Sequence, residues 1–172
     1  GKSVYVCTED DEIATVATRS GARVFKLTSE MAGDEVSSTV PCLALYDWLQ
    51  GQRISVEYVF NLQPTSPLRT AEDIYCAFDI LRQANKDFLV SVTQIDPHYF
   101  HWAVVERANN WGMYFGKEFL KERTMLPPVF RPNGAIKLAK ASRLKEEGTY
   151  FGNPLAVYEM PEERSIHVAT EF

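Results

Sequence analysis

The sequence predicts an α/β protein built on a mostly parallel sheet. Segments with strand and helix patterns alternate from Ser3 to Met160, as in sheets whose parallel strands are joined by helical crossovers. The run 56–63 (VEYVFNLQ) is almost continuously apolar, so we expect it to be a central strand buried on both faces. The 172 residues are 45% hydrophobic and 24% charged, which suits a single globular domain over residues 1–172.

Each element has its own local signal. The acidic residues 9–12 suit the first turn of a helix, and Gly21 is placed to end it. Thr70 and Asp73 have the spacing of a capping box that begins another helix. The expected order is strand 3–8, helix from 9–12 to Gly21, strand 22–25, helix 38–50, strand 56–63, helix 70–84, strand 88–93, strand 135–139, helix 142–147 and strand 155–160.

The segment 94–129 breaks this regular alternation. It is rich in aromatic residues, prolines and mixed charges (DPHYFHW, NNWGMYF) and has neither a helical nor a strand period. We therefore expect an excursion from the sheet. Aromatic side chains on a surface segment are the composition that the core of a protein interface prefers.

Composition excludes several classes of protein. Eighteen Lys and Arg against 23 Asp and Glu give a net charge of −5, so no general basic field collects nucleic acid. No apolar run approaches the roughly 20 residues that span a bilayer. Cys7, Cys42 and Cys76 are odd in number and widely spaced, so we expect free thiols. A cytoplasmic protein that binds neither nucleic acid nor membrane is the resulting expectation.

The loop 63–69 (QPTSPLR) follows the expected central strand, at the sheet edge where ligands of open α/β folds bind. Two prolines stiffen the backbone, while Gln63, Thr65 and Ser66 offer polar side chains. Arg69 adds a cation that suits a carboxylate or phosphate. The same residues also fit a proline-stiffened turn that leads into a helix, and both interpretations stay open.

Five stretches resemble the acylneuraminate cytidylyltransferase (CMP-N-acetylneuraminate synthetase) family in the same order along the chain. The heptad LQPTSPL is the most specific of them, and the resemblance covers most of the sequence. The stretches are residues 6–14, 34–38, 62–74, 131–136 and 160–166.

The resemblance implies a Rossmann-like three-layer nucleotide-diphospho-sugar transferase fold. It also implies the family reaction, in which CTP and an acylneuraminate give CMP-acylneuraminate and pyrophosphate with the help of Mg²⁺. The segment 94–129 would then be a dimerisation excursion of a homodimer that binds a sialic-acid-like sugar and CTP. By position, the sugar-binding residues would be Gln63, Thr65, Ser66, Asn133, Tyr150, Phe151 and Arg123, the nucleotide-binding residue Ser37 or Ser38, and the supporting residues Arg69 and Arg164.

Several of these residues have simpler interpretations. Tyr150 and Phe151 could be an aromatic pair of the core instead of packing on the acyl group of a sugar. Arg123 could be a solvated surface cation instead of reaching the partner's site. For His98 and His101 we expect ordinary surface or interface roles.

The sequence also departs from the family. Members open with a strand and a basic, glycine-containing loop that we do not find before Ser3. We therefore expect strands 3–8 and 56–63 to pair directly or to accept a segment of another chain. His167 and Ala169 stand where the family has two metal-binding aspartates, and Mg²⁺ requires oxygen ligands, so we expect no bound Mg²⁺. Lys137 replaces an aromatic hydroxyl. The expected function is therefore a CTP:sugar nucleotidyltransferase or, alternatively, a non-catalytic sugar-binding or interaction module.

Overall fold

The computed structural model describes residues 3–33 and 35–168, except for the side chains of Glu118 and Arg123. The chain divides into two compact units, each assembled from separate segments. The first unit contains residues 1–61, 81–89 and 137–156, and the second contains residues 62–80, 90–136 and 157–172. The single domain predicted over 1–172 stays a prediction, and each unit is described by itself.

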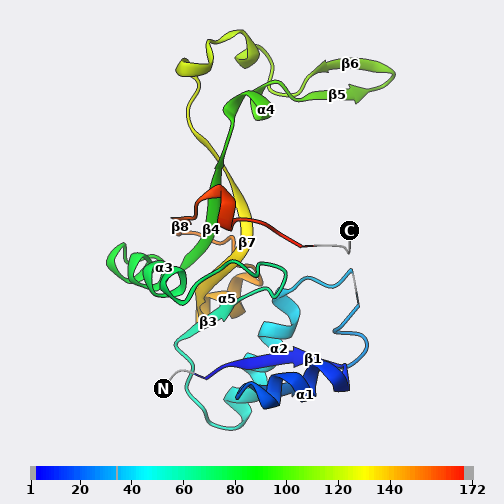
Figure 1. Ribbon diagram of the computed structural model, residues 1–172, viewed down its shortest axis with the longest axis vertical. Coiled ribbons are helices and arrows are strands. Elements are labelled where there is room, and N and C mark those ends of the chain that lie inside the picture. The colour runs from blue at the N-terminus through cyan, green and yellow to red at the C-terminus, as the bar shows by residue number, and fades with distance from the viewer. Residues whose placement is uncertain (1–2, 34, 169–172) are drawn as a thin grey trace. The chain divides into compact units, whose positions relative to one another are not determined.

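The first unit begins with a strand, a helix and a second strand (Figure 1). These are β1 (Tyr5–Thr8), α1 (Asp11–Arg19) and β2 (Arg23–Lys26). The Asp10 carboxylate caps α1 by accepting from the Ile13 amide at 2.8 Å, and Gly21 follows the helix with φ of +82°. β1 and β2 are parallel, with Tyr5 opposite Arg23, which is the expected strand–helix–strand unit.

The rest of the first unit packs around α2 (Thr39–Gly51), which contacts β1, β3 (Tyr58–Asn61) and α5 (Ala141–Glu147). Among the residues the structure describes, β1 pairs only with β2, and β3 is an edge strand whose neighbour is β7 (Val129–Lys140). Direct pairing of β1 with β3 was therefore a wrong prediction, as was a central position for β3, whereas the alternative that a segment of another chain pairs with these strands stays a prediction. One edge of β3 is occupied by β7, with Asn61 opposite Lys137.

The second unit contains most of α3 (Ala71–Gln83) and most of β4 (Phe88–Ile95). The end of α3 and the start of β4 belong to the first unit. It also holds much of β7, the end of β8 (Leu155–Glu159) and the short helix η3 (Glu162–Arg164). β4 is buried over its first six residues, as its apolar sequence predicts. The strands β3, β7, β4 and β8 form one sheet in that order.

Between β4 and β7 the chain leaves the sheet, in the region where the excursion 94–129 was predicted, and the role of that segment in a dimer stays a prediction (Figure 1). It contains α4 (Pro97–His101), a hairpin of β5 (Val104–Arg107) and β6 (Asn110–Met113), and the short helices η1 (Glu118–Leu120) and η2 (Arg123–Met125). Large apolar side chains are exposed along it, and Trp111 is 71% exposed. Its composition is therefore that of a surface that can bury aromatic area against a partner.

The α/β class predicted from the sequence is confirmed. β1 and β2 are parallel, whereas β3 with β7 and β5 with β6 are antiparallel. The sheets are thus mixed, because β7 enters its sheet from the excursion and not through a helical crossover. No helix within residues 3–33 or 35–168 is long and apolar enough to cross a bilayer.

Candidate functional site

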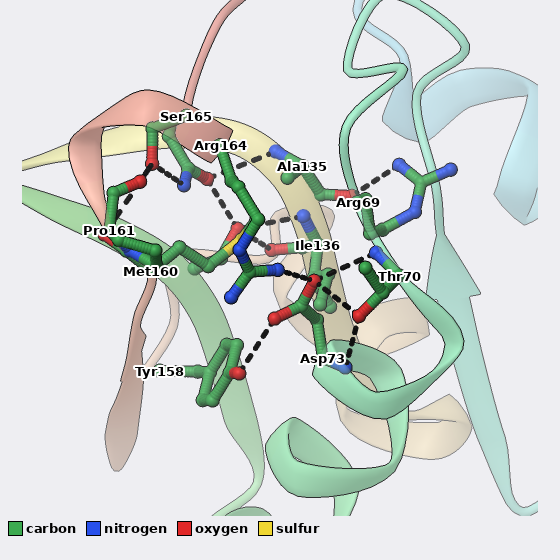
Figure 2. Close-up of polar contacts among 12 residues, drawn as sticks. Arg69, Thr70, Asp73, Ala135, Ile136, Tyr158, Met160, Pro161, Arg164 and Ser165 are labelled. Carbon is green, nitrogen blue, oxygen red and sulfur yellow. Dashed lines mark hydrogen bonds and ion pairs between the residues drawn. The ribbon is translucent and has the colours of Figure 1, made fainter.

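Arg69 holds the loop 63–69 in shape within the second unit (Figure 2). Its guanidinium donates to the carbonyl oxygens of Gln63 at 3.0 Å and Ala135 at 2.8 Å, so one side chain ties the loop to β7. The loop also contains a turn in which the Ser66 amide donates to the Gln63 carbonyl at 3.3 Å. Burial lowers the pKa of Arg69, and the nearby Asp73 opposes this effect. Arg69 is therefore a positioning residue, with part of its donors already in use.

Two hydroxyls of this loop are buried without a hydrogen-bond partner among the described residues: those of Thr65 and Ser66. Ser66 is only 2% exposed. The backbone of Thr65 is fixed, because its carbonyl accepts from the Val168 amide at 2.8 Å. Buried hydroxyls without partners are costly and are uncommon in folded proteins, so each one calls for an explanation. A ligand that hydrogen-bonds to them is one such explanation.

Gly134 brings Gln63 and His167 together at the same place. Its φ is +77°, and a Cβ at this position would lie 2.8 Å from Gln63 Oε1 and 3.6 Å from His167 Nδ1. The left-handed backbone conformation favours glycine here, and a Cβ would make the end of the Gln63 side chain shift. Two of the predicted residues thus lie beside each other, next to the backbone that carries Thr65 and Val168.

Asn133 is 3% exposed and its amide belongs to a buried network. Its Oδ1 accepts from the Ser91 hydroxyl at 2.5 Å and from the Ala135 amide at 3.1 Å, and its Nδ2 donates to Ser165 Oγ at 2.9 Å. An amide oxygen has two acceptor positions, and both are taken. The structure therefore gives Asn133 a role in joining β4, β7 and the end of η3. Sequence reasoning missed Ser91 altogether.

Asp73 is the centre of a second polar cluster in this unit, drawn in Figure 2. It is 1% exposed, is ion-paired with Arg164, and accepts from the Tyr158 hydroxyl at 2.8 Å and the Thr70 amide at 2.7 Å. Burial by itself would raise the pKa of Asp73, but these donors outweigh it and hold that pKa at about 2. Burial and the carboxylate raise the pKa of Tyr158 to about 12. Arg164 is thus engaged in structure.

In the first unit, the side chain of Ser38, one of the two predicted nucleotide-binding residues, contacts two other polar side chains. Its hydroxyl does not cap α2, and it accepts from Asn61 Nδ2 at 3.1 Å and from Lys137 Nζ at 3.1 Å. Ser37 does cap locally, because its hydroxyl accepts from the Thr39 amide at 3.3 Å. Of the two candidates, Ser38 is therefore the one whose side chain faces other polar groups. Asn61 was not foreseen.

Tyr150 and Phe151 differ in environment although they are adjacent. Tyr150 is 1% exposed, and its hydroxyl has no hydrogen-bond partner among the described residues, whereas Phe151 is 50% exposed. Burial and the neighbouring Cys42 thiol raise the pKa of Tyr150. The burial of Tyr150 is compatible with both interpretations of this residue, and the exposed Phe151 ring is available for contacts. Cys7, Cys42 and Cys76 are half-buried free thiols.

The excursion holds the remaining candidates. His101 is buried against Phe100 and Phe115, and neither ring nitrogen has a hydrogen-bond partner among the described residues. His98 contacts the Trp102 ring at 4.8 Å between centroids. The side chain of Arg123 lies outside the described residues, so its predicted role stays a prediction.

Comparison with known proteins identifies the relatives of this chain. No family model matches it. N-acylneuraminate cytidylyltransferase A of Danio rerio is 30% identical over 177 residues, covering 96% of this chain and 38% of that protein. N-acylneuraminate cytidylyltransferase of Streptococcus agalactiae is 25% identical over 169 residues, covering 98% of this chain and 40% of that protein. The chain is a relative of the N-acylneuraminate cytidylyltransferases.

Two further comparisons bear on this relationship. CMP-N,N'-diacetyllegionaminic acid synthase of Legionella pneumophila is 26% identical over 157 residues, covering 89% of this chain and 66% of that protein. A solved CMP:2-keto-3-deoxy-manno-octonic acid synthetase in complex with CTP has the same fold, with a TM-score of 0.62 at 12% identity. The structural match covers 93% of this chain and 73% of the solved chain. The chain spans about two fifths of the length of the first two cytidylyltransferases.

The structure describes no side-chain cluster for Mg²⁺, and the expectation that this ion is not bound stays a prediction. Within residues 3–33 and 35–168, no group of three or more His, Cys, Asp or Glu side chains could hold a metal. His167 offers an imidazole beside Gly134, and Ala169 lies outside the described residues. Mg²⁺ prefers hard oxygen ligands in octahedral geometry, which a single imidazole does not supply.

Proposed function

We propose that this protein binds an acylneuraminate-type sugar in a cytidylyltransferase-type site, with CTP as the second ligand. The relationship to the N-acylneuraminate cytidylyltransferases supports the class of site. The observation that carries the proposal is the pair of buried hydroxyls on Thr65 and Ser66, which have no hydrogen-bond partner among the described residues. Sugar hydroxyls both donate and accept hydrogen bonds, so they match this need.

The roles of the individual residues follow from their contacts. Gln63 would present its amide beside Gly134, and Thr65 and Ser66 would bond to hydroxyls of the sugar. Arg69 keeps this loop fixed through its bonds to two carbonyl groups, which limits the entropy lost on binding.

A second candidate function is a sugar-binding module that does not catalyse transfer. His167 favours it, because an imidazole stands beside Gly134 and Gln63 where the family resemblance expects a carboxylate. Magnesium would neutralise charge on the triphosphate in the family reaction. The imidazole of His167 is not an oxygen ligand for that ion, so this candidate function is a chain that binds and orients a sugar without transferring it.

Calorimetric titration with N-acetylneuraminate tests the proposal. We expect Thr65→Val and Ser66→Ala each to weaken sugar binding by about tenfold, because a lost hydrogen bond to a bound ligand is worth roughly 1–2 kcal/mol. Thr15→Val is the control, since Thr15 is an exposed threonine of α1, away from the loop 63–69 in the sequence. Equal affinities for all variants, or no sugar binding by the wild-type protein, would refute the proposal.

Pyrophosphate release separates the two candidate functions. The assay combines CTP, N-acetylneuraminate, Mg²⁺ and a high concentration of the protein. Release above the blank supports the transferase. Sugar binding without release, and without binding of CTP and Mg²⁺, supports the non-catalytic module.

We also propose that the protein is a homodimer that buries the excursion. The exposed side chains that support this are Tyr99, Trp102, Trp111, Leu120 and Met125. Aromatic residues and methionine are enriched in interface cores. Light scattering should give the mass of a dimer for the wild-type protein and that of a monomer for Trp111→Ser. A monomer mass for the wild-type protein would exclude the dimer.

A further inference from the structure

Lys137 is a half-buried cation for which no acidic partner is found among the described residues. Its ammonium contacts the Ser38 hydroxyl at 3.1 Å. By contrast, Lys26 is paired with Asp11, Lys140 with Asp87 and Lys145 with Asp47. Removing an ammonium from water without a counter-ion is costly, so this arrangement favours an anion from outside the chain.

The hydrogen-bond inventory of Ser38 points in the same direction. A serine hydroxyl has two acceptor positions and one donor hydrogen. Asn61 and Lys137 occupy both acceptor positions, each at 3.1 Å. The hydroxyl hydrogen therefore remains to be donated, and up to two ammonium hydrogens of Lys137 remain as well. Asn61 is held in turn, because its Nδ2 also donates to the Ser38 carbonyl at 3.0 Å.

The surroundings of Lys137 make this donor set stronger than it would be in water. Burial lowers the pKa of Lys137, and the neighbouring Cys42 thiol opposes that shift. Burial likewise raises the pKa of Cys42, so this thiol stays neutral at pH 7 and supplies no counter-charge. The ammonium is thus partly desolvated beside the neutral Ser38 hydroxyl and Cys42 thiol, which strengthens its attraction to an anion.

We propose that Lys137 and the Ser38 hydroxyl form a binding site in the first unit for the oxyanion of a ligand, either a carboxylate or a phosphate group. Ser38 donates one hydrogen bond and Lys137 supplies the charge. Asn61 fixes the serine side chain and does not contact the anion. The inference deepens the proposed function by naming the charged group that this part of the chain recognises, but it does not depend on the sugar contacts of Thr65 and Ser66.

Two matched pairs of probes separate the two sources of the anion. N-acetylneuraminate is compared with its methyl ester, which lacks only the carboxylate charge, and CMP is compared with cytidine. We expect one pair to differ at least tenfold in affinity for the wild-type protein. The carboxylate is the source if the sugar pair differs, and the phosphate is the source if the nucleotide pair differs.

Variants of Lys137 test whether the lysine causes that difference. Lys137→Met keeps the aliphatic stem and removes the charge, so we expect the tenfold difference to disappear. Lys137→Arg keeps the charge and should preserve most of the affinity difference. Lys145→Met is the control, because Lys145 is an exposed lysine of the same unit that is paired with Asp47.

Thermal unfolding provides a readout that does not depend on the choice of organic ligand. Inorganic phosphate should raise the Tm of the wild-type protein and of Lys145→Met, and leave that of Lys137→Met unchanged. Without phosphate, Lys137→Met should be at least as stable as the wild type, because it lacks a desolvated charge.

The inference is overturned if both probe pairs bind the wild type with equal affinity and phosphate does not shift its Tm. It is also overturned if Lys137→Met retains the wild-type affinity difference within a probe pair and the wild-type rise of Tm with phosphate. Sugar binding that depends on Thr65 and Ser66 but not on Lys137 would support the proposed function and refute the anion site. A Lys137-dependent response to phosphate without sugar binding would support the anion site and refute the proposed function.

Discussion

Arg164 and Asp73 form an ion pair between η3 and the first turn of α3, across 91 residues of sequence. The Asp73 side chain is buried, whereas the Arg164 side chain is 34% exposed. Thr70 and Tyr158 donate to the same carboxylate, at 2.7 and 2.8 Å. This cluster therefore joins the segment that follows β8 to the helix that follows the loop 63–69.

The cluster makes stability depend on pH. The pKa of Asp73 is held at about 2 in the folded protein, below the roughly 3.9 of an unfolded aspartate. Its stabilising effect is thus complete above about pH 5 and is lost as the pH falls through about 2. Asp73→Asn should lower the free energy of unfolding at pH 7 by about 2 kcal/mol and reduce its change between pH 5 and pH 2.

Urea denaturation at several pH values measures both effects. Asp79→Asn is the control, since Asp79 lies exposed on the same helix. If both variants retained the wild-type pH dependence, the network around Asp73 would not control acid stability.

Ser66 and Ser91 form a matched pair of buried serines with opposite expected behaviour. Ser66 has no hydrogen-bond partner among the described residues, whereas the Ser91 hydroxyl accepts from the Ile136 amide at 2.8 Å. Ser66→Ala should leave the free energy of unfolding unchanged or raise it by about 1 kcal/mol, and Ser91→Ala should lower it by about 1–3 kcal/mol. Chemical denaturation without ligand distinguishes them. A large loss for Ser66→Ala would mean that its hydroxyl supports the fold and is not kept for a ligand.

Asn133 should matter more for folding than its predicted sugar contact would require. Asn133→Ala removes a side chain that bonds to Ser91, Ser165 and the Ala135 amide. Because buried groups are left without partners, the free energy of unfolding should fall by about 2–4 kcal/mol. Asn110→Ala, on the exposed β6, is the control. Normal stability combined with lost sugar binding would instead favour direct contact with the ligand.

Gly134 offers a test of the geometry beside His167. Gly134→Ala should cost about 1–2 kcal/mol for the left-handed conformation alone, and more because the new methyl group would press on Gln63. The double variant with Gln63→Ala should recover the second part only. Gly112→Ala is the control, because a Cβ there meets nothing within 4 Å. Strict additivity of the two substitutions would show that Gln63 does not lie against Gly134.

Local signals in the sequence predicted most elements well. The acidic run before α1, the Thr70–Asp73 capping box and the apolar run of β4 all depend on near neighbours, and each begins its element within a few residues of the expected position. The position of β3 was missed for the opposite reason. A short apolar run looks the same at a sheet's edge and at its centre, and only its pairing with β7 decides between them.

The candidate site likewise has features that the sequence determined and features that only the tertiary structure decided. The sequence alone determined the α/β class, the loop 63–69 and its polar residues, the excursion at 94–129 and the substitution at His167. The tertiary structure decided that Asn133 and Arg164 are engaged in buried networks, that Thr65 and Ser66 lack partners, and that Lys137 meets Ser38. The physical reason is that a polar side chain's role depends on which groups use its hydrogen-bonding capacity. Those groups are brought by strands and helices that lie far away in the sequence.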